Sequence, residues 1–180
     1  GMLVSSVSMS GGKLEADETS TVSGTLTQSG NITIDVATGK TLTYSGAAVS
    51  LGAKTLTLSG GGTLGNTNAI KLNNATSKLL LNSITVGSVS TSLANSGLDV
   101  DNNSTVTSLT VGHITPVSIA SGKTLSGAIT VTAGSIKLDE AGTLVSSVSM
   151  SGGTLDVDNS STVSGTLTQS GDIAIDVASG

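Results

Sequence analysis

The sequence contains no cysteine, no tryptophan, no phenylalanine and no arginine, and it has one proline, one tyrosine and one histidine. Without cysteine, disulfides and thiolate metal sites are excluded. Seven scattered lysines and a net charge of −5 provide neither the cationic footprint nor, without aromatics, the stacking surface of a nucleic-acid-binding protein. No apolar run approaches the roughly 18 residues of a membrane span. We therefore expect no nucleic-acid partner and no membrane insertion of this segment.

Small hydroxyl residues are what the chain has in abundance, with 31 serines and 27 threonines among 180 residues. The core must then come from Leu, Val, Ile, Ala and a few Met, because aromatic side chains are almost missing. Disordered chains are poor in aliphatics and rich in charge, whereas this one has a mean hydropathy of +0.29 and only 11% charged residues. The composition predicts a folded domain with a narrow aliphatic core.

A long repeat links the two ends of the sequence. Residues 3–39 align without gaps to residues 144–180, at an offset of 141, with 29 identities in 37 positions. The first residues lack the charged and apolar regions of a signal peptide. We expect residues 1–180 to form one solenoid domain that is a fragment of a longer repetitive protein.

A shorter rhythm runs inside the long unit. Coils are predicted to begin at Leu3, Val22, Thr41, Thr55, Leu79, Val106, Thr124, Leu144 and Val163. Most of these starts follow one another at intervals of 18 to 20 in residue number, and the exceptions are 14, 24 and 27. Three strands of about 4–5 residues, joined by turns of about two, use roughly 18–21 residues, which predicts a triangular coil.

The local pattern is that of strands. In residues 31–37, Ile32, Ile34 and Val36 alternate with Thr33 and Asp35, as in a half-buried strand. No window shows a helical period. A sandwich also has short strands, but its core usually contains aromatics and its sequence does not repeat. We predict an all-β fold: a single-stranded parallel β-helix, or β-solenoid, right-handed by the usual crossover preference, of about nine coils.

Three segments carry a resemblance to a group of known proteins: TGKTLTYSG at 38–46, KTLTLSGGGTLG at 54–65 and ASGKTLSGAITV at 120–131. They resemble the repeats of large bacterial exported proteins, namely autotransporter passengers and filamentous-haemagglutinin-type adhesins. The resemblance implies a parallel β-helix, a location outside the cell or on the bacterial surface, and structural or adhesive work. Surface glycans, or other copies of the chain joined by ends or edges, would be the partners.

Two motifs fail on their context. Residues 60–65 match the dinucleotide fingerprint G-x-G-x-x-G, but a strand-like segment follows instead of a helix, so we predict a tight turn and no nucleotide cofactor. His113 is the only histidine, and no G-x-S-x-G accompanies it, so we expect a surface or turn residue.

Acidic pairs are the remaining candidates for chemistry. They occur at Glu15/Asp17, Asp99/Asp101 and Asp156/Asp158. Residues two apart share a strand face, so the acids should point to solvent while their neighbours point inward. A polysaccharide-acting enzyme would need such acids to converge, and we expect no enzyme. We predict solvated acidic turns and no metal site, with calcium as a weak alternative that would use Asp99, Asp101, Asp156 and Asp158 as oxygen ligands.

Threonine pairs offer one more alternative. Thr-x-Thr occurs at 25/27, 41/43, 55/57, 130/132 and 166/168. A flat, regular threonine array on a solenoid could bind ice, although uneven coil lengths would disturb its registry. The leading hypothesis is a non-enzymatic structural or adhesive stalk segment, with a polysaccharide-acting enzyme and an ice- or calcium-binding module as alternatives.

Overall fold

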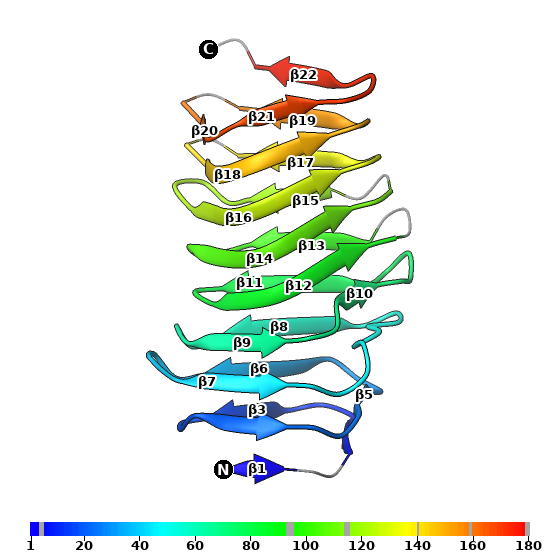
Figure 1. Cartoon of the computed structure of the whole chain (residues 1–180), viewed down its shortest axis with the longest axis vertical. Coiled ribbons are helices and arrows are strands. Elements are labelled where there is room, and N and C mark those ends of the chain that lie inside the picture. Colours follow the sequence, from blue (N-terminus) through cyan, green and yellow to red (C-terminus); the bar gives the residue numbers. More distant parts are fainter. Residues whose placement is uncertain (4–5, 93–95, 114–115, 140, 159, 179–180) are drawn as a thin grey trace.

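The computed structural model describes residues 1–3, 6–92, 96–113, 116–139, 141–158 and 160–178, and these wind into one parallel β-solenoid (Figure 1). All pairings between named strands are parallel, and the described ranges contain no helix. No element in them therefore has the length and hydropathy of a membrane-crossing helix. As the chain rises in Figure 1, the nearer strands run to the right and the farther ones to the left, so the coil is right-handed, as predicted.

Three faces enclose the core. The first face is built from β1 (Met2–Leu3), β4 (Ser20–Val22), β7 (Thr41–Tyr44), β9 (Thr63–Asn66), the first halves of β12 (Thr85–Thr91), β14 (Ser104–Val111), β16 (Thr124–Val131) and β18 (Thr143–Met150), and β20 (Thr162–Ser164). The second face holds β2 (Val7–Met9), β5 (Leu26–Gln28), β10 (Ile70–Leu72), the second halves of β12, β14, β16 and β18, and β21 (Leu167–Gln169).

The third face is a separate nine-stranded sheet. Its strands are β3 (Lys13–Ala16), β6 (Ile32–Val36), β8 (Thr55–Ser59), β11 (Lys78–Asn82), β13 (Gly97–Val100), β15 (Pro116–Ile119), β17 (Ser135–Leu138), β19 (Thr154–Val157) and β22 (Ala174–Val177). We call one circuit of the three faces a rung. Nine strands stacked along a face correspond to about eight turns from the first to the last.

Vertical files of aliphatic side chains make the core. On the third face one inward file runs through Ile32, Leu56, Leu79, Leu98, Val117, Ile136, Leu155 and Ile175. The alternation of apolar and polar residues places each of these side chains inward and its neighbours outward. All members of this file except Ile175 are buried, as the period-2 pattern predicts.

Turn lengths are more even than the sequence spacings indicated. The residue numbers of partners one rung apart differ by 19 at the contact between Ser6 and Thr25 and by 24 at the contact between Asp35 and Ser59. The predicted coil starts at Thr55 and Leu79 are wrong, because these residues lie on the third face and not on the first. The strand that begins at Thr55 resembles the one that begins at Thr41 but lies on another face, which produced the false interval of 14 residues between predicted coil starts. On the first face, the positions equivalent to Thr41 in the next two rungs are Thr63 and Thr85.

Glycines allow the chain to turn sharply at the corners. Gly60 and Gly61, which began the false dinucleotide fingerprint, have φ of 107° and 77° in the turn between β8 and β9. The left-handed region is open to glycine at little cost, so this segment is a tight turn, as predicted. Between the first and second faces, Gly127 has φ of 133° and lies against the carbonyl oxygen of Val106 on the rung below.

A few polar side chains interrupt the aliphatic core, and two of them lie on the first face in β7 and β9. The only tyrosine, Tyr44, is buried, and its hydroxyl accepts a hydrogen bond from the Leu26 N–H (3.0 Å) and donates one to the Ala47 carbonyl (2.8 Å). Asn66 is buried next to it in the same file and donates to the carbonyls of Asn68 and Ser88. These partners satisfy groups that would otherwise be costly to bury.

Candidate functional site

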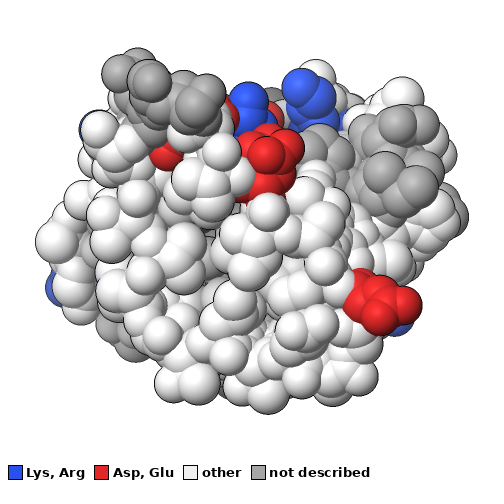
Figure 2. Space-filling model, turned by 90° about the horizontal axis from the view of Figure 1, so that it is seen from above, with Lys and Arg blue, Asp and Glu red and all other residues white. Residues whose placement is uncertain are grey.

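Charge is gathered on the third face of the solenoid. Nine of the twelve acidic residues lie in its strands or directly after them: Glu15, Asp17, Asp35, Asp99, Asp101, Asp139, Asp156, Asp158 and Asp176. Lys13, Lys78 and Lys137 belong to the same strands. In the end-on view of Figure 2, charged side chains cluster along one side while broad areas elsewhere are uncharged. The outer surface therefore has one ionic face and two faces dominated by small neutral side chains.

Lysines join acids from neighbouring rungs on this ionic face. The Lys13 Nζ lies 2.6 Å from Glu15 Oε1 and 3.1 Å from Asp35 Oδ2, one rung further. Hydrogen bonding to Glu15, and then to Asp35, raises the pKa of Lys13. The arrangement neutralises two carboxylates that the parallel register stacks directly on one another.

The same arrangement recurs near the other end of the face. The Lys137 Nζ lies 3.5 Å from Asp139 Oδ1 and 3.4 Å from Asp158 Oδ2. Attraction to Asp158 is the largest effect that raises the pKa of Lys137. These lysine bridges are surface ion pairs, which contribute little to folding stability but prevent like charges from meeting unpaired.

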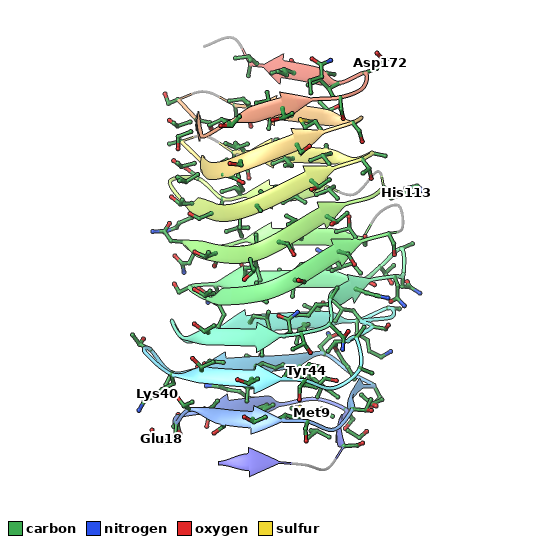
Figure 3. All side chains as sticks on the ribbon, viewed as in Figure 1. Met9, Glu18, Lys40, Tyr44, His113 and Asp172 are labelled. Carbon is green, nitrogen blue, oxygen red and sulfur yellow. The ribbon has the colours of Figure 1, made fainter. Side chains whose placement is uncertain are left out.

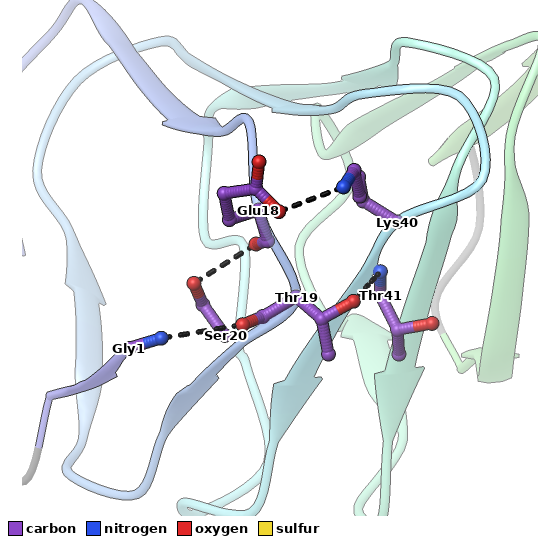
Figure 4. Close-up of polar contacts among 6 residues, drawn as sticks. All are labelled: Gly1, Glu18, Thr19, Ser20, Lys40 and Thr41. Atoms are coloured by element: carbon purple, nitrogen blue, oxygen red, sulfur yellow. Dashed lines mark hydrogen bonds and ion pairs between the residues drawn. The ribbon is translucent and has the colours of Figure 1, made fainter.

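A third lysine forms an ion pair at the corner before the first face. The Lys40 Nζ and Glu18 Oε2 are 2.7 Å apart (Figure 4), and the hydrogen bond from Lys40 lowers the pKa of Glu18. Beside them the Thr41 N–H donates to the Thr19 hydroxyl over 3.4 Å. The corner links consecutive rungs with exposed, solvated groups.

The four calcium candidates lie on the ionic face in two separate places. Asp99 is in β13 with Asp101 directly after it, and Asp156 and Asp158 are in and after β19, three strands further along the sheet. Three steps correspond to about 14 Å. The Asp158 carboxylate contacts Lys137, and no group of three or more His, Cys, Asp or Glu side chains suited to a metal occurs among the described residues.

Asp99 differs from the other acids in its environment. Its carboxyl is half-buried, and desolvation raises its pKa, opposed by Lys78 and assisted by Asp101 and Asp139. The predicted inward neighbour Val100 is buried, as are Leu98 and Ala16. The expectation that the acids point away from the core is therefore confirmed for Asp99 and Glu15, although Asp99 is less solvated than expected.

Hydroxyl groups form an ordered file on the first face. Thr19, Thr41, Thr63, Thr85, Thr105 and Ser126 occupy equivalent outward positions on six consecutive rungs. Strand spacing places neighbours about 4.8 Å apart. A second file, Ser90, Thr110, Thr130, Ser149 and Thr168, runs along the second face. Unequal turn lengths do not break these files, because the extra residues lie at the corners.

The Thr-x-Thr pairs do not themselves make this array. The pair 41/43 lies on the first face, 55/57 on the third, and 25/27, 130/132 and 166/168 on or beside the second. The informative signal is a constant offset of 22 in residue number, seen in Thr19, Thr41, Thr63 and Thr85. That offset equals one turn of the chain in this region, a length that only the register reveals.

The single histidine lies at a lateral edge of the solenoid. His113 follows β14 in a bend, as predicted, and Figure 3 shows it at one lateral edge, with Lys40 and Glu18 at the opposite edge.

The lysine bridges were not anticipated from sequence, although Lys-x-Glu and Lys-x-Asp followed by an acid about one turn later would have indicated them.

Comparisons with known proteins add no relative. No protein-family model matches the chain, and neither a curated protein nor a solved structure matches it. The candidate functional surface is thus defined by geometry alone: an ionic face bridged by lysines, and two faces bearing files of hydroxyl groups.

Proposed function

We propose that this chain is a non-enzymatic stalk segment of a bacterial secreted or cell-surface protein, with a structural and weakly adhesive role. The observation that carries the proposal is the stacking of aliphatic side chains in files along the core, beneath one ionic outer face and two faces of small neutral side chains. The third-face file alone contains seven consecutive buried side chains, from Ile32 to Leu155. Such a stack resists bending because each rung is held by main-chain hydrogen bonds to both neighbours.

Adhesion would arise from many equal contacts. The hydroxyl files repeat one weak hydrogen-bonding group on six consecutive rungs of the first face and on five of the second, over lengths of roughly 24 Å and 19 Å. A polymer with its own repeating hydroxyls, such as a surface glycan, can contact several rungs at once and gain affinity by multivalency. The resemblance of the repeats to exported bacterial adhesins supports the same role and location.

The test is a bead-adhesion assay with the chain tethered at increasing density, read against a glycan array. We expect adhesion to rise more steeply than density, and single outward substitutions such as Thr110→Ala or Asp101→Ala to change it by less than about twofold. Abolition of binding by either substitution would contradict a distributed contact. A parallel digestion screen with pectin-like and alginate-like polymers tests the rival, and cleavage would favour the polysaccharide-acting enzyme.

A second candidate function, ice binding, is favoured by one specific observation. Five threonines in a single file, from Thr19 to Thr105, repeat at about 4.8 Å on a face whose strands carry no charge. A regular array of this kind can order water into a lattice. Thermal hysteresis measured on the chain tests the idea, with Thr63→Lys as the disrupting variant and Thr57→Lys, on the ionic face, as its control. Equal behaviour of both variants would remove this candidate.

A further inference from the structure

One corner of the solenoid is shorter than the corners directly below and above it. The chain passes from the third face to the first through residues 60–62 after β8, residues 83–84 after β11 and residues 101–103 after β13. These corners belong to the lateral edge on which Figure 3 labels Lys40 and Glu18. Because the middle corner has two residues and its neighbours have three each, a hollow is left between them.

The hollow is a small cleft, which we call the corner notch. It is lined by Gly61 of the lower corner, residues 83–85 of the middle rung and residues 103–105 of the upper one, and its volume is about 180 Å³. Pockets that enclose a drug-sized ligand measure about 300–1,000 Å³. The corner notch therefore has room for one small unit of a larger molecule.

Ser83 holds the floor of the corner notch in a strained backbone conformation. Its φ is 57°, in the left-handed region that residues other than glycine rarely adopt. Its carbonyl accepts a hydrogen bond from the Gly61 N–H over 2.6 Å, which ties the middle corner to the lower one. Glycine would take this conformation at less cost, and strain of this kind is concentrated at ligand sites. The strain keeps a hydroxyl in the lining where glycine would offer none.

Four polar groups of the corner notch are left for a ligand. The hydroxyls of Ser83, Thr85 and Thr105 make no hydrogen bond to another described residue. Asn103 Oδ1 accepts a hydrogen bond from the Thr124 N–H over 3.0 Å, which fixes the side-chain amide and leaves Nδ2 to donate elsewhere. Three hydroxyls and one amide can both donate to and accept from the hydroxyls of a sugar.

The charges around the corner notch favour a neutral sugar over an acidic one. None of its lining residues is charged, and Asp101 begins the upper corner. A carboxylated or sulfated sugar would meet this carboxylate with no lysine in the lining to offset the repulsion. A neutral sugar meets no such repulsion.

We propose that the corner notch is a binding subsite for one neutral hexose unit of a glycan. The inference rests on the proposed adhesive function and adds to it a place that selects the sugar. Thr85 and Thr105 also belong to the first-face file, so a glycan with one unit in the notch continues along that file. No aromatic side chain lines the notch as a stacking platform, so the expected affinity for a single sugar is about millimolar.

Titration of the ¹⁵N-labelled chain with methyl glycosides, followed by amide NMR shifts, tests the subsite. The neutral probes are methyl β-galactoside, methyl β-glucoside and methyl α-mannoside, and methyl β-glucuronide is the anionic counterpart. We expect saturable shifts centred on residues 83–85 and 103–105 with at least one neutral probe. Affinity for the glucuronide should be at least about fivefold lower.

Two variants remove hydroxyls from the corner notch, and one serves as their control. Ser83→Gly also relieves the positive φ, so it should melt at the same or a higher temperature while binding about three- to tenfold more weakly. Thr105→Val keeps the side-chain shape and should weaken binding by a similar factor. Ser126→Ala removes a hydroxyl from the same first-face file outside the notch and should bind like the unaltered chain.

Two results would overturn the subsite. One is the absence of saturable shifts at residues 83–85 with every neutral probe. The other is equal weakening by Ser83→Gly and Ser126→Ala, which would assign the contact to the file as a whole. Either result leaves the bead-adhesion test intact, because that test reports the summed contacts of many rungs. Conversely, absent bead adhesion with saturable notch shifts would remove the adhesive function and uphold the subsite.

Discussion

Replacing Leu98 with alanine tests whether the central file holds the solenoid together. Leu98 is fully buried in β13 and is paired on one side with Leu79 and on the other with Val117, both also fully buried. The strands that carry these neighbours are fixed by hydrogen bonds at about 4.8 Å, so they cannot close around the space left by the substitution. The cavity should therefore persist.

The expected cost follows from that rigidity. Core Leu→Ala substitutions cost about 2–5 kcal/mol, and sites that cannot collapse lie in the upper part of the range. We expect Leu98→Ala to lower the free energy of unfolding by about 3–4 kcal/mol. Ile175→Ala, in the same file at the exposed end, should cost less than about 1 kcal/mol because the side chain is 52% exposed.

Urea denaturation followed by far-UV circular dichroism measures both variants, and native-state hydrogen exchange locates the weakened rungs. Because each rung contacts only its neighbours, a central defect should also reduce cooperativity between the two halves. A cost below about 1 kcal/mol for Leu98→Ala, or equal costs for the two variants, would refute the reasoning that stacked files carry the stability.

Three further predictions concern the ionic face and the corners. Burial raises the pKa of the Asp99 carboxyl, so the folded protein binds the carboxyl proton more tightly than the unfolded chain and loses stability as pH rises through the raised pKa. Asp99→Asn should remove that loss, which thermal melts of both proteins across the acid-to-neutral range would show. Lys137→Gln should lower the melting temperature slightly at low salt and have no effect at high salt, since its ion pairs are exposed. Gly127→Ala should lower the free energy of unfolding by at least about 2 kcal/mol, because φ is positive and the new Cβ meets the Val106 carbonyl. Gly97→Ala has open space around the new Cβ and should change the free energy of unfolding by less than about 1 kcal/mol in the same urea assay.

The candidate site was less predictable than the fold. The outward direction of Glu15 and Asp99 followed from their alternation with buried neighbours, which is a property of any single strand. The meeting of Lys13 with Asp35, and the file from Thr19 to Ser126, depend on which residues lie one rung apart. The length of one turn is not constant along the chain, and a change of one residue moves a side chain to the opposite face. Strand pairing alone decides these neighbours.

Alternation along the chain, the long internal repeat, the aliphatic composition and the frequent turn residues were sufficient to determine a parallel solenoid of small cross-section, because each is a local property that the stack only repeats. The tertiary structure decided which segments belong to which face. It moved Thr55 and Leu79 to the third face, gathered nine acids on one sheet and aligned the threonines into a file. The physical reason is that corner loops absorb unequal lengths while backbone hydrogen bonds between rungs hold the register, and side chains far apart in sequence meet only through that register.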